Sequence, residues 1–504
     1  MSRREAMTVI CSGALIPVAS SFGRFPEVPQ AVRTPNKDDL IFMSATALAE
    51  AIRTKRVSSE EVVRAHIERI QEVNPKINAV VQLVADNALK QAREADAALA
   101  RGEIKGPLHG VPVTIKDSLD TAGVISTGGT KGRASFVPKK NATAVARILS
   151  AGAILLGKTN TPEFTFYGET DNLVYGRTNN PYNLLKTPGG SSGGAAAIIA
   201  SGGSPLDLGS DTGGSIRAPS HCCGISGIKP TSGRVPRTGH IVPFAAGLSD
   251  SLTQIGPLAR YVEDLILALP IIVGPDWRDP AIVGMPLGNP HNIVLKDLRI
   301  AYHTDNGITT PIPEIVGAVK RAAEELAKTG IRLEERRPTG IEQTKELNDQ
   351  LWAACTDAEV RRFFQAAGTS ESEISPFLRK AIDAMKQFKP MTAGEVDDLM
   401  ARLDLYRSSM LSFMEGFDAI LCPVNAYPAL EHGLFGDWDH DPGWTYTYAY
   451  NLTGWPGVVV RGGTTNEGIP VGVQVVARPW REDVALAIAL HLEKTLGGWQ
   501  KPQI

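Results

Sequence analysis

One lysine and two glycine-rich loops that carry serines hold the residue types needed for acyl transfer. Lys116 ends a short apolar segment, a first loop from Gly189 to Gly194 contains Ser191, and a second loop from Asp211 to Arg217 contains Ser215. A serine hydroxyl is a weak nucleophile and needs a base within hydrogen-bond reach. Lysine can be that base only while its amine is neutral, so these residues indicate a serine nucleophile served by a neutral lysine.

The surroundings of Lys116 favour a neutral amine. The pKa of a lysine is ordinarily about 10.4 and must fall to about 7, which corresponds to roughly 4 kcal/mol. Burial can lower the pKa by that amount, and the flanking Val111, Val113 and Ile115 predict that Lys116 is buried. The alternative is a lysine at a strand end whose amine reaches water.

The segment 187–220 is rich in small residues, with nine glycines and seven serines in 34 positions. A flexible linker has a similar composition. However, the apolar run Ala195–Ala200 and the segment Pro205–Leu208 separate the two loops, and a linker has no use for either. Glycine-rich loops joined to strand and helix patterns bring backbone N–H groups close to a ligand or a developing anion, and these loops predict that arrangement.

Two other patterns compete with this interpretation. Residues 152–159 match the phosphate-binding pattern G-x-x-x-x-G-K-[ST], but their apolar centre predicts the strand itself, whereas a phosphate loop follows a strand and opens a helix. Residues 189–193 match the G-x-S-x-G elbow of α/β-hydrolases, in which Ser191 is the nucleophile of an esterase. Residues 183–188 lack the apolar strand that the elbow needs, and this esterase stays open as an alternative.

Taken together, five segments resemble the amidase signature family. They are residues 112–117, 157–163, 178–181, 187–220 and 224–231. No single segment is specific, whereas the set is highly specific; it spans about 110–231, and family-like character runs from about residue 44 to the end. The resemblance implies an α/β fold with a single large domain, in which helices surround a central mixed β-sheet.

The resemblance also implies a catalytic triad of Lys116, Ser191 and Ser215. In the family pattern Ser215 is the nucleophile that forms the acyl-enzyme, and Ser191, whose peptide bond is cis, bridges it to Lys116. Backbone N–H groups of the second loop form the oxyanion hole, residues 163–169 line the acyl pocket, and two charged residues brace the second loop. The residues so assigned are Thr212, Gly213 and Gly214 with Ser215 for the oxyanion hole, Thr165 and Ser192 for substrate binding, and Asp211 and Arg217 for structural support.

Helix and strand patterns alternate along the chain, which is typical of the α/β class. Ser44 and the capping box from Ser58 to Glu61 begin two early helices, the second of which is expected to end at Asn74 and Pro75. Further helices are expected over 85–100, 142–150 and 313–329, and a charged helical stretch over about 340–415 indicates a peripheral layer. Strands are expected over 111–117, 153–156, 298–302, 331–333, 419–423, 457–461 and 471–476.

Composition narrows the class of protein. The 504 residues are 43% hydrophobic and 21% charged, which is typical of a globular chain. Lys and Arg number 52 against 54 Asp and Glu, so the net charge of −2 predicts no nucleic-acid partner. No apolar run reaches the 18 residues of a membrane span, so no stable membrane insertion is expected.

Neither a disulfide framework nor a metal site is predicted. The five cysteines include one adjacent pair, Cys222 and Cys223, and sequence neighbours rarely bridge each other. The C-x-x-C and H-E-x-x-H spacings of zinc sites are absent. We therefore expect no metal and no cofactor, and we expect residues 221–223 to be ordinary core residues.

The first 25 residues follow the order of a secretory signal peptide. Arg3 and Arg4 form a basic start, which loosely resembles a twin-arginine signal, and Thr8–Ala19 is mostly apolar before a group of small residues. Export to the periplasm or the cell exterior is expected on this basis; the alternative is a frayed tail on a cytoplasmic protein. Prolines within 26–40 indicate a linker, and one domain over 41–504 follows.

An aromatic segment bears on the substrate. Residues 435–455 hold seven of the 31 aromatic residues of the chain. Two interpretations are open. If these residues line a substrate cleft, aryl or long-acyl amides are the preferred substrates; otherwise they are part of the core and lid packing.

Three classes of function remain. The first is an amidase that hydrolyses the C–N bond of a linear carboxylic amide, with a small-molecule substrate that is aromatic or hydrophobic if the cleft exists. The second is the glutaminase (A) subunit of a tRNA-dependent amidotransferase, which shares the triad and needs partner subunits. The third is a relative without turnover, which the intact Lys116, Ser191 and Ser215 disfavour. A homodimer is compatible with each class.

Overall fold

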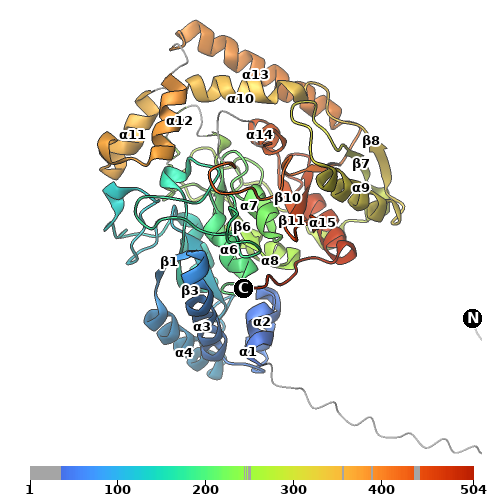
Figure 1. The fold of residues 1–504 in the computed structure, drawn as a ribbon. Helices are drawn as coiled ribbons and strands as arrows, with labels where there is room; N and C mark the ends of the chain where they lie inside the picture. The colour runs from blue at the N-terminus through green and yellow to red at the C-terminus, as the bar shows by residue number, and fades with distance from the viewer. Residues whose placement is uncertain are drawn as a thin grey trace, which may run out of the picture. The chain divides into compact units, whose positions relative to one another are not determined.

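An 11-stranded mixed sheet forms the centre of the protein (Figure 1). The structure is a computed structural model, and it describes residues 36–504 apart from 243, 246, 248–250, 355–356, 387–389 and 436–442. Fifteen α-helices accompany the sheet in these residues, and the predicted α/β fold of one large domain is confirmed. The expected signal peptide lies outside the described residues, as does the expected linker up to residue 35.

Three parallel strands bring together the residues that the sequence singles out. β2 (Pro112–Lys116) lies between β3 (Ile154–Thr159) and β4 (Leu206–Asp211), and every residue of these strands is buried. β2 runs parallel to both neighbours. The carboxyl ends of parallel strands meet at one edge of a sheet, so Lys116 and Asp211, the last residues of β2 and β4, lie at the same edge.

The remaining strands extend the sheet on both sides of this centre. The order is β1-β3-β2-β4-β6-β5-β10-β11-β9-β7-β8, with β6 antiparallel to β4 and β1 antiparallel to β3. Each strand expected from the sequence is present within a few residues. The bounds are β1 (Val80–Leu83), β5 (Ser226–Lys229), β6 (Gln254–Ala259), β7 (Arg299–Tyr302), β8 (Arg332–Glu335), β9 (Ala419–Pro423), β10 (Gly457–Thr464) and β11 (Pro470–Ala477).

β3 is longer than the sequence predicts. The expected strand ends before Gly157, whereas β3 continues through Lys158 to Thr159 because it pairs with β2 and β1 on its two sides. A Cβ on Gly157 would lie 2.1 Å from the carbonyl oxygen of Gln82. Gly157 therefore permits the close approach of β1, and it does not end the strand.

The N-terminal helices show two further differences from the prediction. α1 (Lys37–Phe42) occupies part of the linker that was expected over 26–40. α3 (Ser59–Ile77), capped by Ser58 as expected, continues past Pro75. The proline lies in the last turn, where its missing N–H removes one intrahelical hydrogen bond. Asn78 in the left-handed conformation ends the helix and donates its N–H to the Asn74 carbonyl at 2.8 Å. The predicted end at Asn74 and Pro75 is therefore wrong.

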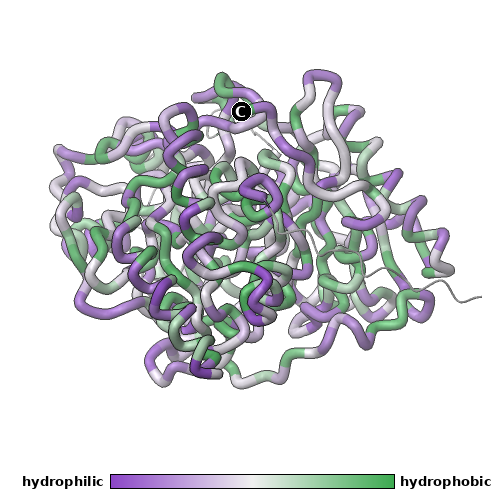
Figure 2. Tube along the Cα trace, turned by 90° about the horizontal axis from the view of Figure 1, so that it is seen from below, coloured by the Kyte–Doolittle hydropathy of each residue, from purple (hydrophilic) through white to green (hydrophobic). Residues whose placement is uncertain are grey.

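Helices cover both faces of the sheet. Hydrophobic and hydrophilic residues alternate along the helices in Figure 2, which is typical of helices with one face on a core. α6 (Gly193–Ala200) and α7 (Arg217–Cys223) differ because every one of their residues is buried. The other helices of the main body are α2 (Ala45–Arg53), α4 (Ala85–Ala100), α5 (Thr143–Ser150), α8 (Val262–Ile272), α9 (Pro313–Ala327), α14 (Thr445–Leu452) and α15 (Glu482–Leu496).

Four helices form the outer layer expected over about 340–415. They are α10 (Thr344–Ala354), α11 (Asp357–Ala367), α12 (Pro376–Lys386) and α13 (Ala393–Phe413), drawn in orange at the top of Figure 1. α10 and α13 share a hydrophobic cluster with α14, which joins the layer to the main body. Phe363 of α11 belongs to a second cluster with Phe164, so the layer also contacts the 163–169 segment.

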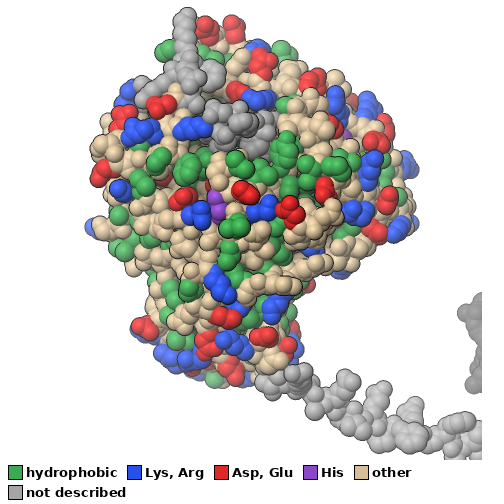
Figure 3. Space-filling view, viewed as in Figure 1, with side chains coloured by type: hydrophobic (Ala, Val, Ile, Leu, Met, Phe, Trp, Pro, Cys, Tyr) green, Lys and Arg blue, Asp and Glu red, His purple; other side chains and the backbone are tan. Residues whose placement is uncertain are grey.

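The surface shows charges of both signs. Lys and Arg side chains are interspersed with Asp and Glu on the face drawn in Figure 3, as the balanced composition predicts. None of the helices in the described part of the chain combines the length and the apolar character that a membrane crossing requires.

Candidate active site

Lys116 lies at the end of β2 with its amine surrounded by hydroxyl groups. Its side chain is fully buried, and Nζ lies 2.7 Å from Ser191 Oγ, 2.9 Å from Ser192 Oγ and 3.0 Å from Ser210 Oγ. No carboxylate of the described residues forms an ion pair with it. A buried ammonium without a counter-charge is costly, so this environment disfavours the charged form of the amine.

The pKa of Lys116 reflects that environment. Burial lowers it to about 7, although the negative charges of Asp211 and Asp207 oppose the shift. The flanking Val111, Val113 and Ile115 are buried, as expected. The alternative of a strand-end lysine in contact with water is therefore wrong, and close to neutral pH a large share of the lysine is an uncharged base.

Ser191 lies in the loop before α6, and its peptide bond to Gly190 is cis. Within the part of the chain that the structure describes, the only hydrogen bond of its hydroxyl is the one to Lys116. Residues 187–192 are irregular, and no strand leads into Ser191. The elbow of an α/β-hydrolase requires such a strand, so the alternative of an esterase with Ser191 as its nucleophile is wrong.

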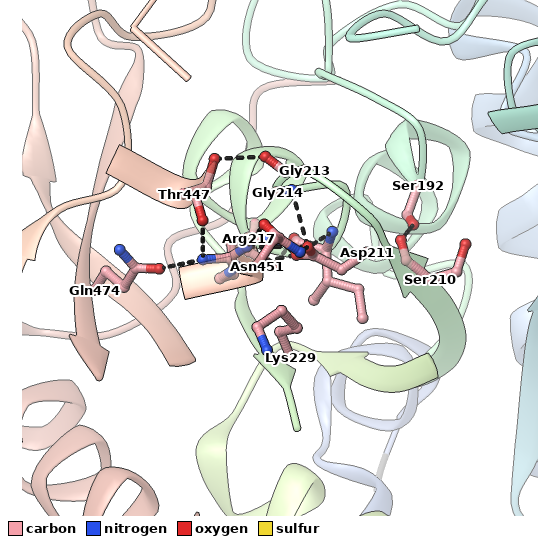
Figure 4. A network of polar contacts seen from close by, with 12 residues as sticks. Ser192, Ser210, Asp211, Gly213, Gly214, Arg217, Lys229, Thr447, Asn451 and Gln474 are labelled. Atoms are coloured by element: carbon pink, nitrogen blue, oxygen red, sulfur yellow. Dashed lines mark hydrogen bonds and ion pairs between the residues drawn. The ribbon is translucent and has the colours of Figure 1, made fainter. Parts of the chain in front are cut away.

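Asp211 fixes the conformation of the second loop through hydrogen bonds to its backbone. Its carboxylate accepts a hydrogen bond from the backbone N–H of Gly214 at 2.8 Å (Figure 4). It also accepts one from the backbone N–H of Ile216 at 3.1 Å. Asn451 of α14 donates to the same carboxylate at 2.9 Å. These bonds fix the course of the loop between β4 and α7, where Ser215 lies.

Arg217 completes this brace as the buried counter-ion of Asp211. Its Nε and Nη2 each lie 3.0 Å from the Asp211 carboxylate, and both side chains are fully buried. Nη1 also donates to the Thr447 carbonyl at 3.1 Å and to Gln474 at 2.8 Å. Burial alone raises the pKa of Asp211, but the charge and the hydrogen bonds of Arg217 outweigh burial and hold that pKa well below its usual range.

The second loop presents fewer free N–H groups than the sequence predicts. The N–H of Gly214, which the sequence assigns to the oxyanion hole, donates to Asp211 and is therefore not free to bind an oxyanion. Across the described chain, the N–H groups of Thr212, Gly213 and Ser215 take part in no such bond. Gly214 has φ +129°, and a Cβ there would lie 2.4 Å from Thr447 Oγ1. Glycine is therefore required at this position.

Ser215 is half-buried at the edge of the site. Its carbonyl oxygen accepts a hydrogen bond from the N–H of Ser192 at 3.2 Å, which ties the two loops together. The structure shows no hydrogen bond between the Ser215 and Ser191 hydroxyls in the residues that it describes. Hydrogen bonds of catalytic groups often tighten only with substrate bound. The structure thus assembles the Lys116–Ser191 half of the expected relay and brings Ser215 beside it.

Aromatic side chains surround the 163–169 segment, which contains Thr165. Phe164 and Thr165 have positive φ angles, and both are buried. The ring of Phe166 meets Trp352 of α10 edge-on at 5.6 Å, and Tyr167 stacks on Phe377 of α12 at 4.6 Å. A Cβ on the neighbouring Gly190 would lie 2.7 Å from the Tyr167 carbonyl. The segment therefore packs directly against the loop that carries Ser191.

Most of the 435–455 aromatics belong to the core. Phe435, Trp444, Tyr446, Tyr450 and Trp455 are buried, which favours core packing over a cleft for these residues. The structure leaves Tyr448 only partly buried, and its ring lies against Gly213 of the second loop. Trp438 lies outside the described residues.

Residues 221–223 are core residues, as predicted. His221, Cys222 and Cys223 are fully buried. The imidazole of His221 is engaged on both sides, with Nε2 3.0 Å from the Tyr427 carbonyl and Nδ1 accepting from the Gly472 N–H. The described residues contain no group of three or more His, Cys, Asp or Glu able to hold a metal ion.

Two residues of the site escape sequence reasoning. Ser210 of β4 contacts the amine of Lys116, and His240 lies 2.9 Å from the Ser210 hydroxyl. Ser210 stands directly before Asp211, and a hydroxyl at the end of an apolar strand could have indicated it. His240 is 30 residues further along the chain, in a stretch without any motif, and no sequence signal indicates it.

Comparisons with known proteins agree with one family. The sequence model of the Amidase family matches residues 61–486. An acylamidase of Rhodococcus erythropolis is 33% identical over 477 residues, which are 91% of this chain and 96% of that protein. The A subunit of the glutamyl-tRNA(Gln) amidotransferase of Carboxydothermus hydrogenoformans is 34% identical over 501 residues, or 90% and 98%. A solved structure of fatty acid amide hydrolase superposes with a TM-score of 0.83 at 26% identity, and the match covers 93% of this chain and 87% of that one.

The brace of the second loop gives a first prediction. We expect Asp211→Asn to destabilise the protein by about 3–5 kcal/mol, because Arg217 keeps its charge without a buried partner. Thermal unfolding measures the loss. Glu482→Gln is a matched control that breaks another buried ion pair, with Arg234. Both variants should melt earlier, but only Asp211→Asn should lose turnover while still folded; wild-type turnover in folded Asp211→Asn contradicts the brace.

Proposed function

The chain belongs to the amidase signature family, and on that premise we propose that it hydrolyses a carboxylic amide through an acyl-enzyme on Ser215. The single observation that carries this proposal is the buried amine of Lys116, 2.7 Å from the Ser191 hydroxyl. A serine nucleophile requires a nearby base. An amine whose pKa burial lowers to about 7 can take up a proton close to neutral pH.

The proposed reaction has two halves. In the first, Ser215 Oγ attacks the carbonyl carbon of the amide, its proton passes to Ser191, and the Ser191 proton passes to Lys116. The C–N bond then breaks, the amine leaves with the proton returned from Lys116 through Ser191, and the acyl group remains on Ser215. In the second half, water attacks the ester by the same route, which releases the carboxylic acid and restores Ser215.

The negative charge of the tetrahedral intermediate needs hydrogen-bond donors. We assign this role to the N–H groups of Thr212, Gly213 and Ser215, since Asp211 holds that of Gly214. Each preorganised donor of this kind lowers the activation free energy of such reactions by about 2.7–4 kcal/mol. The Asp211–Arg217 brace supports the assignment because it fixes the loop before any substrate binds.

The proposed substrate has an apolar acyl or aryl group. The 163–169 segment lies against the Ser191 loop, and the rings of Phe166 and Tyr167 pack with aromatic residues of α10 and α12. Tyr448 adds a partly exposed ring beside Gly213. Large aromatic surfaces favour apolar ligands. An acylamidase and a fatty acid amide hydrolase among the similar proteins support the same substrate class.

The glutaminase function is the second candidate, because the amidotransferase relative is as similar in sequence as the acylamidase. Glutamine carries a charged amino group and a charged carboxylate, and aromatic rings supply no counter-ion for either group. This contrast favours the stand-alone amidase.

The acyl-enzyme is directly testable. We expect wild-type protein quenched during turnover of 4-nitroacetanilide to carry one acetyl group on Ser215, detected by peptide mass spectrometry, because the acetyl group stays on Ser215 until water hydrolyses the ester. Ser215→Ala should fold, as judged by an unchanged melting temperature, and should lose at least about a thousandfold in kcat/KM. Ser220→Ala, a buried serine on α7, is the matched control and should retain turnover. Full activity in folded Ser215→Ala rules out this nucleophile.

The substrate class has its own test. We expect the chain purified alone to hydrolyse 4-nitroacetanilide and hexanamide with a higher kcat/KM than acetamide, because the longer or aromatic groups bury more apolar surface. Glutamine should be a poor substrate under the same conditions. The ranking is measured by the release of ammonia from hexanamide, acetamide and glutamine, and by the release of 4-nitroaniline from the anilide. Preference for glutamine, or for acetamide, contradicts the proposed class.

A further inference from the structure

The amine of Lys116 faces three hydroxyls that differ in where their protons can go. An ammonium donates three hydrogen bonds, whereas a neutral amine donates two and accepts one. Ser191, Ser192 and Ser210 can all accept from the ammonium. When the amine is neutral, one of the three must turn its own proton toward the nitrogen, and the relay functions only if that hydroxyl is Ser191.

Two of these hydroxyls have another acceptor. The hydroxyl of Ser192 donates to the Ser210 carbonyl oxygen at 3.2 Å, and the hydroxyl of Ser210 lies 2.9 Å from Nε2 of His240. Figure 4 shows the first of these contacts. The Ser191 hydroxyl has no partner but Lys116 among the residues that the structure describes. Ser191 is therefore the hydroxyl whose proton is available to the amine, provided that Nε2 of His240 is an acceptor.

The backbone places His240 for this contact. The segment that carries it runs beside the chain leaving β2: Ile241 N–H donates to the Ser118 carbonyl at 2.8 Å, and Asp120 N–H donates to the Gly239 carbonyl at 2.9 Å. The imidazole is buried. Burial, together with the nearby charge of Lys116, lowers the pKa of His240 to about 3, so the ring is neutral close to neutral pH.

A neutral imidazole carries one proton, and its position decides the direction of the Ser210 hydroxyl. Nδ1 of His240 lies 3.1 Å from the Val242 carbonyl oxygen and 3.2 Å from the Val242 backbone nitrogen, so it can donate to the first or accept from the second. With the proton on Nδ1, the ring donates to that carbonyl and Nε2 accepts from Ser210. With the proton on Nε2, Ser210 accepts from the ring, and its own proton competes with that of Ser191 for the lysine. While Lys116 is an ammonium, the first tautomer leaves the Val242 N–H without its ring acceptor, whereas the second leaves the Ser210 hydroxyl proton unpaired beside the ammonium. The second arrangement is the costlier one because that proton faces a positive charge, so the first tautomer is favoured.

We propose that His240 is a positioning residue for this reaction: it accepts the proton of the Ser210 hydroxyl and thereby leaves Ser191 as the sole hydroxyl that donates to Lys116. This role rests on the proposed function, since it directs the relay to Ser215. His240 touches no substrate, and it acts on the lysine through Ser210.

Other charged groups around the two residues stay the same when His240 is replaced. Asp207 and Asp211 face Lys116 from β4, and Lys158 lies on the neighbouring β3. Arg237 and Arg133 face His240, and each is paired with a carboxylate, Asp279 and Asp120 respectively. A change in the pH dependence on replacing His240 therefore reports on the Ser210 hydroxyl and the lysine.

The test measures how fast a fluorophosphonate probe modifies Ser215 as a function of pH. Ser215 Oγ forms the bond to phosphorus, fluoride leaves, and the serine proton passes to Lys116, so the rate reports the base without a known substrate. His240→Leu removes the acceptor. Its plateau rate should fall about three- to tenfold, the value of one neutral hydrogen bond, because the lysine now also binds the Ser210 proton.

The acid limb of the profile should move as well. In His240→Leu the Ser210 proton has no acceptor while Lys116 is charged, which destabilises the ammonium and lowers the pKa of the lysine. The limb should therefore shift to lower pH by about 0.5–1. His240→Gln, whose side-chain oxygen can accept the same bond, should restore both the plateau and the limb. His66→Leu, at another buried histidine, is the matched control and should leave the profile unchanged.

Rescue by a second substitution separates this role from a structural one. Adding Ser210→Ala to His240→Leu removes the competing hydroxyl and should raise the plateau back toward that of Ser210→Ala alone. If His240→Leu does not fold, His240→Met supplies the same loss of the acceptor. An unchanged profile in folded His240→Leu, or a loss that Ser210→Ala does not reverse, overturns the proposal. Wild-type protein that the probe does not label at Ser215 counts instead against the proposed function.

Discussion

The structure depends on the burial of one amine. Lys116 ends a strand whose residues are all buried, and its Nζ meets hydroxyls and no carboxylate in the described residues. Water is thereby withheld from a group that is ordinarily charged, and its pKa falls to about 7. The parallel sheet supplies this environment because β3 and β4 flank β2 on both sides. The fold therefore buries the amine that is the base of the proposed reaction, and the two serine loops lie around it.

The buried charges of Arg217 and Asp211 differ from Lys116 because they neutralise each other. Arg217 and Asp211 are an ion pair without exposure to water, and their remaining hydrogen-bonding atoms engage the backbone of the second loop and the side chains of Asn451 and Gln474. A pair satisfied in this way holds a loop in one conformation. Lys116 has no ion-pair partner among the described residues, whereas Asp211 is paired with Arg217. The ends of two adjacent strands thus carry the proposed base and the carboxylate that fixes the loop of the proposed nucleophile.

Local signals in the sequence predict much of this arrangement. The loops around Ser191 and Ser215, the lysine between apolar neighbours and the alternation of helices and strands are all readable within short segments. The errors have non-local causes. Gly157 breaks the strand pattern because β1 approaches it closely. α3 passes Pro75 and ends three residues later at Asn78, whose side chain donates to the carbonyl of the distant Tyr175. His240 reaches Ser210 only through tertiary contact between segments far apart in the sequence, so no motif could indicate it.

Neutron crystallography of the full chain tests the central claim most directly, because it locates hydrogen atoms. At about pH 9, well above the pKa of about 7, the account predicts two deuterons on Nζ of Lys116 and a Ser191 hydroxyl whose deuteron points at the nitrogen. Three deuterons on Nζ at that pH, with the Ser191 deuteron turned away, would contradict it.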